Sequence, residues 1–150
     1  MATISSDHEL RLALDGLTRE QQRVLGGQFV NSVSDLCDDT RVKRAVEIAM
    51  DPDANPLDKE EAFRSAKAVA VKTYTDCGKD TDWLAQAAHF VAAATAACLA
   101  PESQQSSDNP AWKAAMQARM ARNCELIERG DGGDRNEVEA QYEVANKFLA

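Results

Sequence analysis

The longest apolar stretch of the chain runs from Trp83 to Ala100, and no Asp, Glu, Lys or Arg interrupts it. Alanine is its commonest residue, so apolar side chains would fall on all sides of a helix instead of along one stripe. A helix of this kind needs neighbours around it to be shielded from water. The pattern therefore predicts a central alanine-rich helix over about residues 81–99, with the other helices packed around it.

Helix start and stop signals divide the rest of the chain. A Ser or Thr followed three residues later by Glu or Gln, and an Asn-Pro pair, are typical of helix N-termini, whereas Gly and Pro often follow helix C-termini. No stretch shows the alternation of apolar and polar residues that is typical of strands. The start signals are Ser6–Glu9, Thr18–Gln21, Asn55-Pro56, Asp80, Asn109-Pro110 and Asp134, and the end signals are Gly16, Asp51-Pro52, Gly78, Pro101 and Gly130.

These signals predict an all-α fold of six or seven helices, in a single domain over residues 1–150. Two successive helix pairs, at residues 40–77 and 80–129, indicate stacked helical hairpins. The polar segment 101–109 is predicted to be a flexible inter-helix loop. Because aromatic residues make up only 5% of the chain, we expect a core of Ala, Val and Leu between closely packed helices.

Apolar residues spaced three or four positions apart predict the buried side of each helix. Gly26-Gly27 lies inside one such helix, where either a kink or the close approach of another backbone would explain the pair. The predicted inward-facing residues are Leu25, Phe29, Val33 and Leu36 after Thr18; Val42, Ala45, Val46, Ala49 and Met50 after Thr40; Trp112, Met116, Met120, Cys124 and Ile127 after Pro110; and Val138, Tyr142, Ala145 and Leu149 in the last helix.

The formal net charge of −8 narrows the range of partners. A nucleic-acid surface requires clustered Lys and Arg, which the chain lacks, and anionic membranes repel an acidic protein. The charge would instead attract a basic protein, or it only keeps the protein soluble. Residues 1–7 lack the features of a secretion signal, and the four Cys are scattered without a close pair. Both observations favour a cytoplasmic protein with reduced thiols.

No catalytic signature, metal-ligand spacing or cofactor motif occurs in the sequence, so we expect no metal site and no cofactor. His89 is the most interesting residue, because an imidazole titrates near neutral pH and this one lies in the most apolar helix. It is either a structural residue bonded to a neighbouring helix or part of a small-ligand or enzyme pocket, for which Cys77 and Cys98 are candidate nucleophiles. The residues of such a pocket would be His89, Gln86, Trp83 and Tyr74.

Acidic residues supply the candidate surface for a partner. We expect them to surround one inter-helix connection and to steer a basic protein towards it. Trp112 is a candidate anchor at a protein interface, and with Met116 and Met120 it forms an alternative docking face. The acidic residues of the predicted patch are Asp38, Asp39, Asp51, Asp53 and Asp58.

The pattern Arg41-x-x-Arg44-Ala-Val-Glu-Ile-Ala, followed by Ala62, Ala66, Ala68 and Ala70 and by Ala87-Ala88-His89, resembles a family of all-helical bacterial proteins assigned as immunity proteins of polymorphic toxin systems. The resemblance covers residues 41–100. Family members tend to carry a second His about two turns after the first, where this chain has Thr95-Ala96. The resemblance implies a cytoplasmic inhibitor that binds a toxin domain.

The sequence therefore favours a small acidic protein–protein interaction module over an enzyme, with a basic toxin domain as the partner that the resemblance implies. Three alternatives stay open: an accessory subunit of a larger complex, a homodimer, and a small-ligand binder or enzyme with a pocket around His89.

Overall fold

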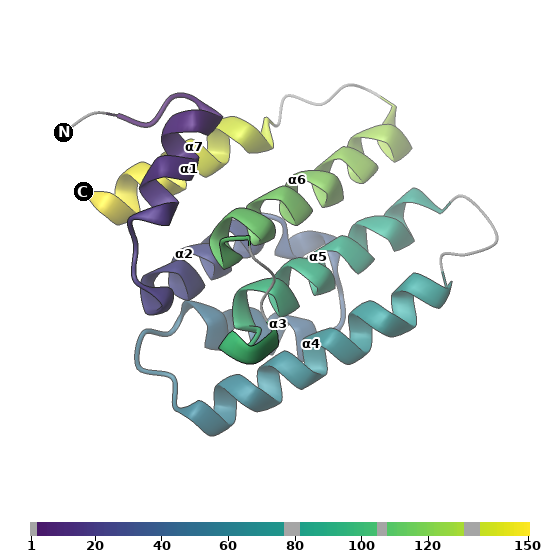
Figure 1. Cartoon of the computed structure of the whole chain (residues 1–150). Helices are drawn as coiled ribbons and strands as arrows, with labels where there is room; N and C mark the ends of the chain where they lie inside the picture. Colours follow the sequence, from purple (N-terminus) through teal and green to yellow (C-terminus); the bar gives the residue numbers. More distant parts are fainter. Residues whose placement is uncertain (1–2, 77–81, 105–107, 131–135) are drawn as a thin grey trace.

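The computed structural model of the chain describes residues 3–76, 82–104, 108–130 and 136–150, and in these residues helices are joined by turns and short loops, without strands (Figure 1). The expected all-α class is therefore confirmed. The elements are α1 (Asp7–Asp15), α2 (Arg19–Asn31), the 3-10 helix η1 (Ser34–Leu36), α3 (Thr40–Met50), α4 (Pro56–Asp76), α5 (Trp83–Leu99), the 3-10 helix η2 (Glu102–Gln104), α6 (Pro110–Arg129) and α7 (Glu137–Leu149).

The helices begin where side chains satisfy their first backbone N–H groups. Ser6 accepts from the backbone of Glu9, and Thr18 and Gln21 form the reciprocal capping box that the sequence predicts. Asn109 caps α6, which ends at Gly130 in the left-handed conformation. These ends follow from local sequence because capping involves residues within one turn.

Two predicted start signals differ from the observed ones. The N-cap of α5 is Asp82 and that of α7 is Asn136. Asp80 and Asp134, the predicted caps, lie outside the described residues, as do Cys77 and Gly78, where α4 was expected to end. Within the predicted loop 101–109, η2 forms at Glu102–Gln104, and residues 105–107 are not described.

Three helices form one layer of the molecule. Figure 1 shows α4, α5 and α6 side by side, with α2 and α3 behind them and with α1 and α7 at one end of the layer. Successive helices pack together, α3 with α4, α4 with α5 and α5 with α6, as expected for helical hairpins. The central position predicted for the alanine-rich helix is confirmed, because α5 packs against α2, α3, α4 and α6.

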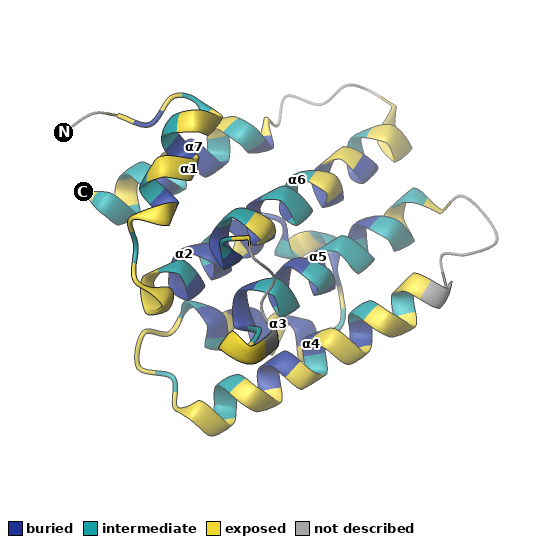
Figure 2. Ribbon diagram, in the orientation of Figure 1, coloured by how far each residue is buried: buried dark blue, intermediate teal, exposed yellow. Residues whose placement is uncertain are grey.

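One side of α5 lacks the cover that the sequence predicts. No helix of the described residues lies over the side that faces away from α2 and α3 (Figures 1 and 2). Three residues of α5, Phe90, Ala93 and Ala97, are half-buried instead of fully enclosed. The expectation of cover on every side is therefore wrong for this side.

The buried face of α6 also differs from the predicted stripe. Met120 and Ile127 are 45% and 54% exposed, and Trp112 and Met116 are half-buried, whereas only Cys124 of the predicted set is buried. Alanines fill the inward side because a small side chain lets neighbouring helices approach closely, so burial here follows size and not hydrophobicity alone. The inward alanines of α6 are Ala111, Ala114, Ala115, Ala118 and Ala121.

The glycine pair of α2 marks the close approach of other helices. A Cβ on Gly26 would lie 2.9 Å from the Cβ of Cys98, and one on Gly27 would lie 3.0 Å from both the Cβ of Ala49 and the backbone nitrogen of Met50. Close approach, and not a kink, therefore explains the pair: α2 remains a continuous helix and presses against α5 on one side and α3 on the other.

Candidate functional site

The acidic residues of the predicted patch lie at two separate places. Asp51, Asp53 and Asp58 surround the α3–α4 connection, whereas Asp38 and Asp39 precede α3 at its other end. A helix of 11 residues is about 16 Å long, so the expectation that all five surround one connection is wrong. What remains at the connection is a smaller patch in which Asp51 and Asp53 are exposed.

Several of these carboxylates have local structural roles. Asp39 caps α3 and accepts two hydrogen bonds from the Arg41 guanidinium, and these bonds hold the pKa of Asp39 below its ordinary value. The Asp51 carboxylate accepts a bond of 2.8 Å from the backbone of Asp53. The backbone of Asp58 donates to the side chain of Asn55 at 2.8 Å. These bonds organise the turns and leave the Asp53 side chain directed to solvent.

The surroundings of His89 have features of both interpretations that the sequence left open, a structural histidine and a member of a pocket. Its Nδ1 shares a hydrogen bond of 3.0 Å with the Thr73 hydroxyl on α4, as expected for a structural histidine bonded to a neighbouring helix. The side chain is nevertheless half-buried, and its ring centre lies 5.8 Å from that of Tyr74. Both residues line a shallow, open hollow of about 290 Å³ with Lys67, Ala70 and Val71.

The structure brings together only two of the four predicted pocket residues. Tyr74 and His89 meet at this hollow, whereas Gln86 and Trp83 do not line it. Cys98 cannot act as a thiolate nucleophile near neutral pH, because burial raises its pKa to about 12. Cys77 lies outside the described residues. In the part of the chain that the structure describes, no three His, Cys, Asp or Glu residues are arranged to hold a metal ion.

Trp112 is engaged within the molecule. The guanidinium of Arg11 on α1 lies 5.1 Å from its ring centre, and that of Arg119 lies 5.9 Å away. Both distances are within the range of cation–π contacts. Trp112 also packs against the cluster that α1, α2, α6 and α7 form around Leu25 and Phe29. Trp112 therefore contributes to the packing of α1 on α6.

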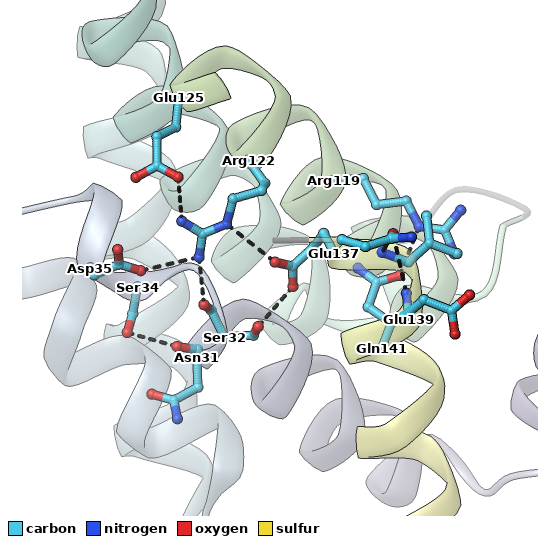
Figure 3. A network of polar contacts seen from close by, with 12 residues as sticks. Asn31, Ser32, Ser34, Asp35, Arg119, Arg122, Glu125, Glu137, Glu139 and Gln141 are labelled. Atoms are coloured by element: carbon cyan, nitrogen blue, oxygen red, sulfur yellow. Dashed lines mark hydrogen bonds and ion pairs between the residues drawn. The ribbon is translucent and has the colours of Figure 1, made fainter. Parts of the chain in front are cut away.

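A buried polar network joins α6 to α7 and to the end of α2 (Figure 3). The Arg122 side chain, 2% exposed, donates to Glu125 at 2.7 Å, to Glu137 at 3.3 Å and to the backbone carbonyl of Ser32 at 2.9 Å, and it pairs with Asp35 at 3.4 Å. All three guanidinium nitrogens therefore have partners. The network is closed to ligands and serves as a joint between helices.

One further cavity was not predicted from the sequence. It is a cleft of about 700 Å³ where the N-terminal parts of α2 and α4 meet the C-terminal end of α5. We call it the cationic cleft, because its charged lining contains more basic than acidic residues. The basic residues of the lining are Arg19, Arg23, Lys59, Arg64 and Lys67, and the acidic residues are Glu20, Glu60 and Glu102.

Arg23 is the buried member of the cationic cleft. It is 7% exposed and donates from Nη1 to the carbonyls of Ile48 and Ala49 at the end of α3, at 2.9 and 2.8 Å. Its Nη2 pairs with Glu20, which also lies 3.9 Å from Lys59. Its Nε is buried without a hydrogen-bond acceptor. An unsatisfied buried donor on a guanidinium is costly, so the Arg23 side chain would be stabilised by an acceptor that reached Nε.

Comparison with protein-family models, with curated proteins and with solved structures finds no significant match. Of the described helices, none combines the length and the apolar character needed to cross a bilayer. The functional argument therefore depends on the surfaces and cavities of this chain.

Proposed function

We propose that the protein acts by binding another protein, and that the contact surface is the uncovered side of the α4–α5–α6 layer. We call this surface the outer face. It comprises Val71 and Tyr74 of α4, Phe90, Ala93 and Ala97 of α5, and Met120 of α6. The observation that carries the proposal is that α5 has no charged residue and yet lacks a helix over this side.

Exposure along the outer face supports the proposal. Val71 and Tyr74 are 59% and 71% exposed, and Met120 is 45% exposed on the side of α6 opposite its buried alanines. Aromatic and methionine side chains are common at the centres of protein interfaces, and a contiguous apolar patch on a folded protein often marks one. The small side chains of Ala93 and Ala97 would let the side chains of a partner approach α5 closely.

The net charge supports a basic partner. An excess of eight negative charges accelerates encounter with a basic protein, while the apolar outer face would hold the complex once it has formed. Asp51 and Asp53 at the α3–α4 connection are exposed members of that charge. The finer proposal is that the partner is a toxin domain which binding inhibits, and the resemblance of residues 41–100 to immunity proteins supports it.

The test is affinity capture from the native host with the full chain as bait. We expect a basic protein that the wild type retains and that Ala93→Glu and Tyr74→Asp lose, since each places a charge in the outer face. Leu57→Asp is the matched control, because Leu57 is 77% exposed on α4 but does not belong to this face. Circular dichroism establishes that every variant is folded.

Two results would overturn the proposal. One is capture of the same proteins by the wild type and by both outer-face variants. The other is a dimer of the chain in solution that Ala93→Glu converts to a monomer, because the outer face would then be a homodimer interface. The finer proposal requires, in addition, that the captured protein is toxic and that one equivalent of this chain inhibits it.

A further inference from the structure

We propose that the cationic cleft binds a small organic phosphate, a phosphate monoester dianion attached to an apolar or aromatic body. The inference does not depend on the outer face or on a protein partner. It rests on the charge of the cleft, on the helix ends that surround it, on the buried Arg23 and on the apolar part of its lining.

The charge of the cleft is opposite to that of the whole molecule. Five basic and three acidic residues line it, a local excess of two positive charges in a protein of net charge −8. Within the lining, Arg19 pairs with Glu102 at 3.4 Å and Arg64 with Glu60 at 2.6 Å, while Glu20 is shared by Arg23 and Lys59. A phosphate monoester is close to dianionic at neutral pH and matches this excess.

The arrangement of helices adds to the positive potential. Arg19, Pro56 and Pro110 are the first residues of α2, α4 and α6, and all three line the cleft. The N-terminus of a helix carries a partial positive charge, because its first N–H groups have no partners within the helix. Three such termini, of helices with 13, 21 and 20 residues, line the cavity, and the C-terminal end of α5, with its partial negative charge, offsets part of their potential.

Arg23 provides an independent indication of a ligand. Its side chain is more than nine-tenths buried in the wall of the cleft, and its Nε lacks an acceptor. A guanidinium binds phosphate oxygens in a planar, two-pronged geometry that a lysine cannot reproduce. A phosphate that reaches this wall would provide the missing acceptor and would compete with Glu20 for the same guanidinium.

The size and the apolar lining indicate an organic body on the phosphate. The cleft volume of about 700 Å³ falls within the range of small-molecule sites. Phe63, Leu99 and Pro101 line it beside the charged residues. The Nζ of Lys67 lies 5.6 Å from the centre of the Phe63 ring, which brings a cation and an apolar surface into direct contact. Inorganic phosphate would leave this apolar part unused.

The test is isothermal titration of the full chain with phenyl phosphate, inorganic phosphate, phenylacetate and 2-phenylethanol at low and at physiological salt. We expect phenyl phosphate to bind one to one, and to bind about tenfold or more tightly than inorganic phosphate or phenylacetate, a difference of about 1.4 kcal/mol. The neutral alcohol should not bind. Because the attraction is electrostatic, affinity should fall as salt increases.

Two variants locate the site. Lys59→Gln/Arg64→Gln removes two cations of the lining and should weaken phenyl phosphate binding by about tenfold or more. Lys72→Gln is the matched control, because Lys72 is exposed on the same helix but does not line the cleft; it should retain wild-type affinity within about a factor of two. Circular dichroism and a thermal melt establish that the double variant is folded.

Three outcomes would overturn the proposal. The first is the absence of phenyl phosphate binding up to about 10 mM, a concentration that corresponds to an affinity too weak for a site. The second is equal weakening by the double variant and by Lys72→Gln, which would indicate non-specific attraction to cations. The third is equal affinity for phenylacetate, which would exclude a site specific for a phosphate dianion.

Discussion

Single side chains decide how closely the helices pack. Gly26 has no Cβ where α2 meets α5, and a Cβ there would lie 2.9 Å from the Cβ of Cys98 and 3.4 Å from the Cα of Ala111. Both are atoms close to a helix backbone and cannot rotate away. The three helices therefore meet at a distance that only a glycine at this position allows.

Gly26→Ala should consequently destabilise the protein although alanine is the better helix former. Overpacking costs about 1–3 kcal/mol, and we expect about 2–3 kcal/mol here because the contacting atoms cannot move away. The gain in helix propensity is at most about 1 kcal/mol, so a net loss of about 1–2 kcal/mol in the free energy of unfolding remains. Urea denaturation measures it. Gly16→Ala is the control, because a Cβ there meets nothing nearer than 3.6 Å. Equal stability of Gly26→Ala and wild type would contradict the close approach.

Arg122 illustrates how burial changes the role of an ion pair. Its side chain is 2% exposed and that of its partner Glu125 is 6% exposed, whereas the pair of Arg64 and Glu60 is 75% and 55% exposed. Exposed pairs contribute little to stability, and a buried charge without its partner is strongly destabilising. The Arg122 network is thus a structural requirement, whereas Arg64 is available for binding.

At the scale of the element, one carboxylate contributes to the docking of α1 on α6 and α7. Asp7, the first residue of α1, accepts bonds from the Arg119 guanidinium at 2.9 and 2.7 Å and from the Tyr142 hydroxyl at 2.8 Å. The bond from Arg119 is the main reason that the pKa of Asp7 lies below its ordinary value of 3.8. The docking of α1 should therefore depend on pH.

Asp7→Asn tests this dependence. A lowered pKa in the folded state stabilises the protein above the ordinary pKa, and this contribution is lost as the pH falls through the lowered pKa. Because the Asp7 side chain is 49% exposed, we expect a loss of only about 0.5–1 kcal/mol at pH 7. Urea denaturation between pH 7 and pH 3 should show the difference from wild type shrinking below about pH 4. A constant difference, or the same effect from Glu143→Gln on α7, would exclude the Asp7 contacts as its source.

The start of a helix can be predicted from the sequence where an interaction between neighbouring residues determines it. The caps at Ser6, Thr18 and Asn109 are set by residues within one turn, and they were predicted correctly. The inward side of α6 was predicted incorrectly. The pattern of large apolar residues pointed to Met120 and Ile127, whereas close packing of α6 against α5 and α2 selects alanine. Which side of a helix is buried depends on the distance to its neighbours, and the sequence of that helix alone does not contain this distance.

The candidate sites also differ in whether their residues meet through sequence order or through the packing of distant helices. Tyr74 and His89 meet because α4 and α5 are consecutive helices, which sequence order makes plausible. The cationic cleft combines Arg23 of α2, Lys59 of α4 and Leu99 of α5, whose proximity depends on how three helices are arranged in space. The sequence shows the basic residues of each helix separately, and no single one of them indicates that they line a common cleft.

At the scale of the whole molecule, the charges are unevenly distributed. The net charge of −8 coexists with an outer face to which α5 contributes no charge and with a cleft of opposite sign. The negative charge is therefore concentrated elsewhere, for example at the α3–α4 connection, where the exposed Asp51 and Asp53 lie two residues apart. Folding fixes these two charges in one turn and brings the other negative charges of the acidic chain nearer to them, and the added repulsion opposes the compact state.

Asp53→Lys should relieve this repulsion and stabilise the fold by about 0.5 kcal/mol at low ionic strength. The gain should largely disappear in about 1 M NaCl, where charges a few ångströms apart are screened. Glu143→Lys makes the same change in net charge one turn from both Glu139 and Lys147, so its local effects should cancel. Thermal melts of the three proteins at low and high salt separate the outcomes. Equal gains from the two variants would mean that total charge alone matters, whereas a gain from Asp53→Lys that survives high salt would exclude charge repulsion at the connection as its cause.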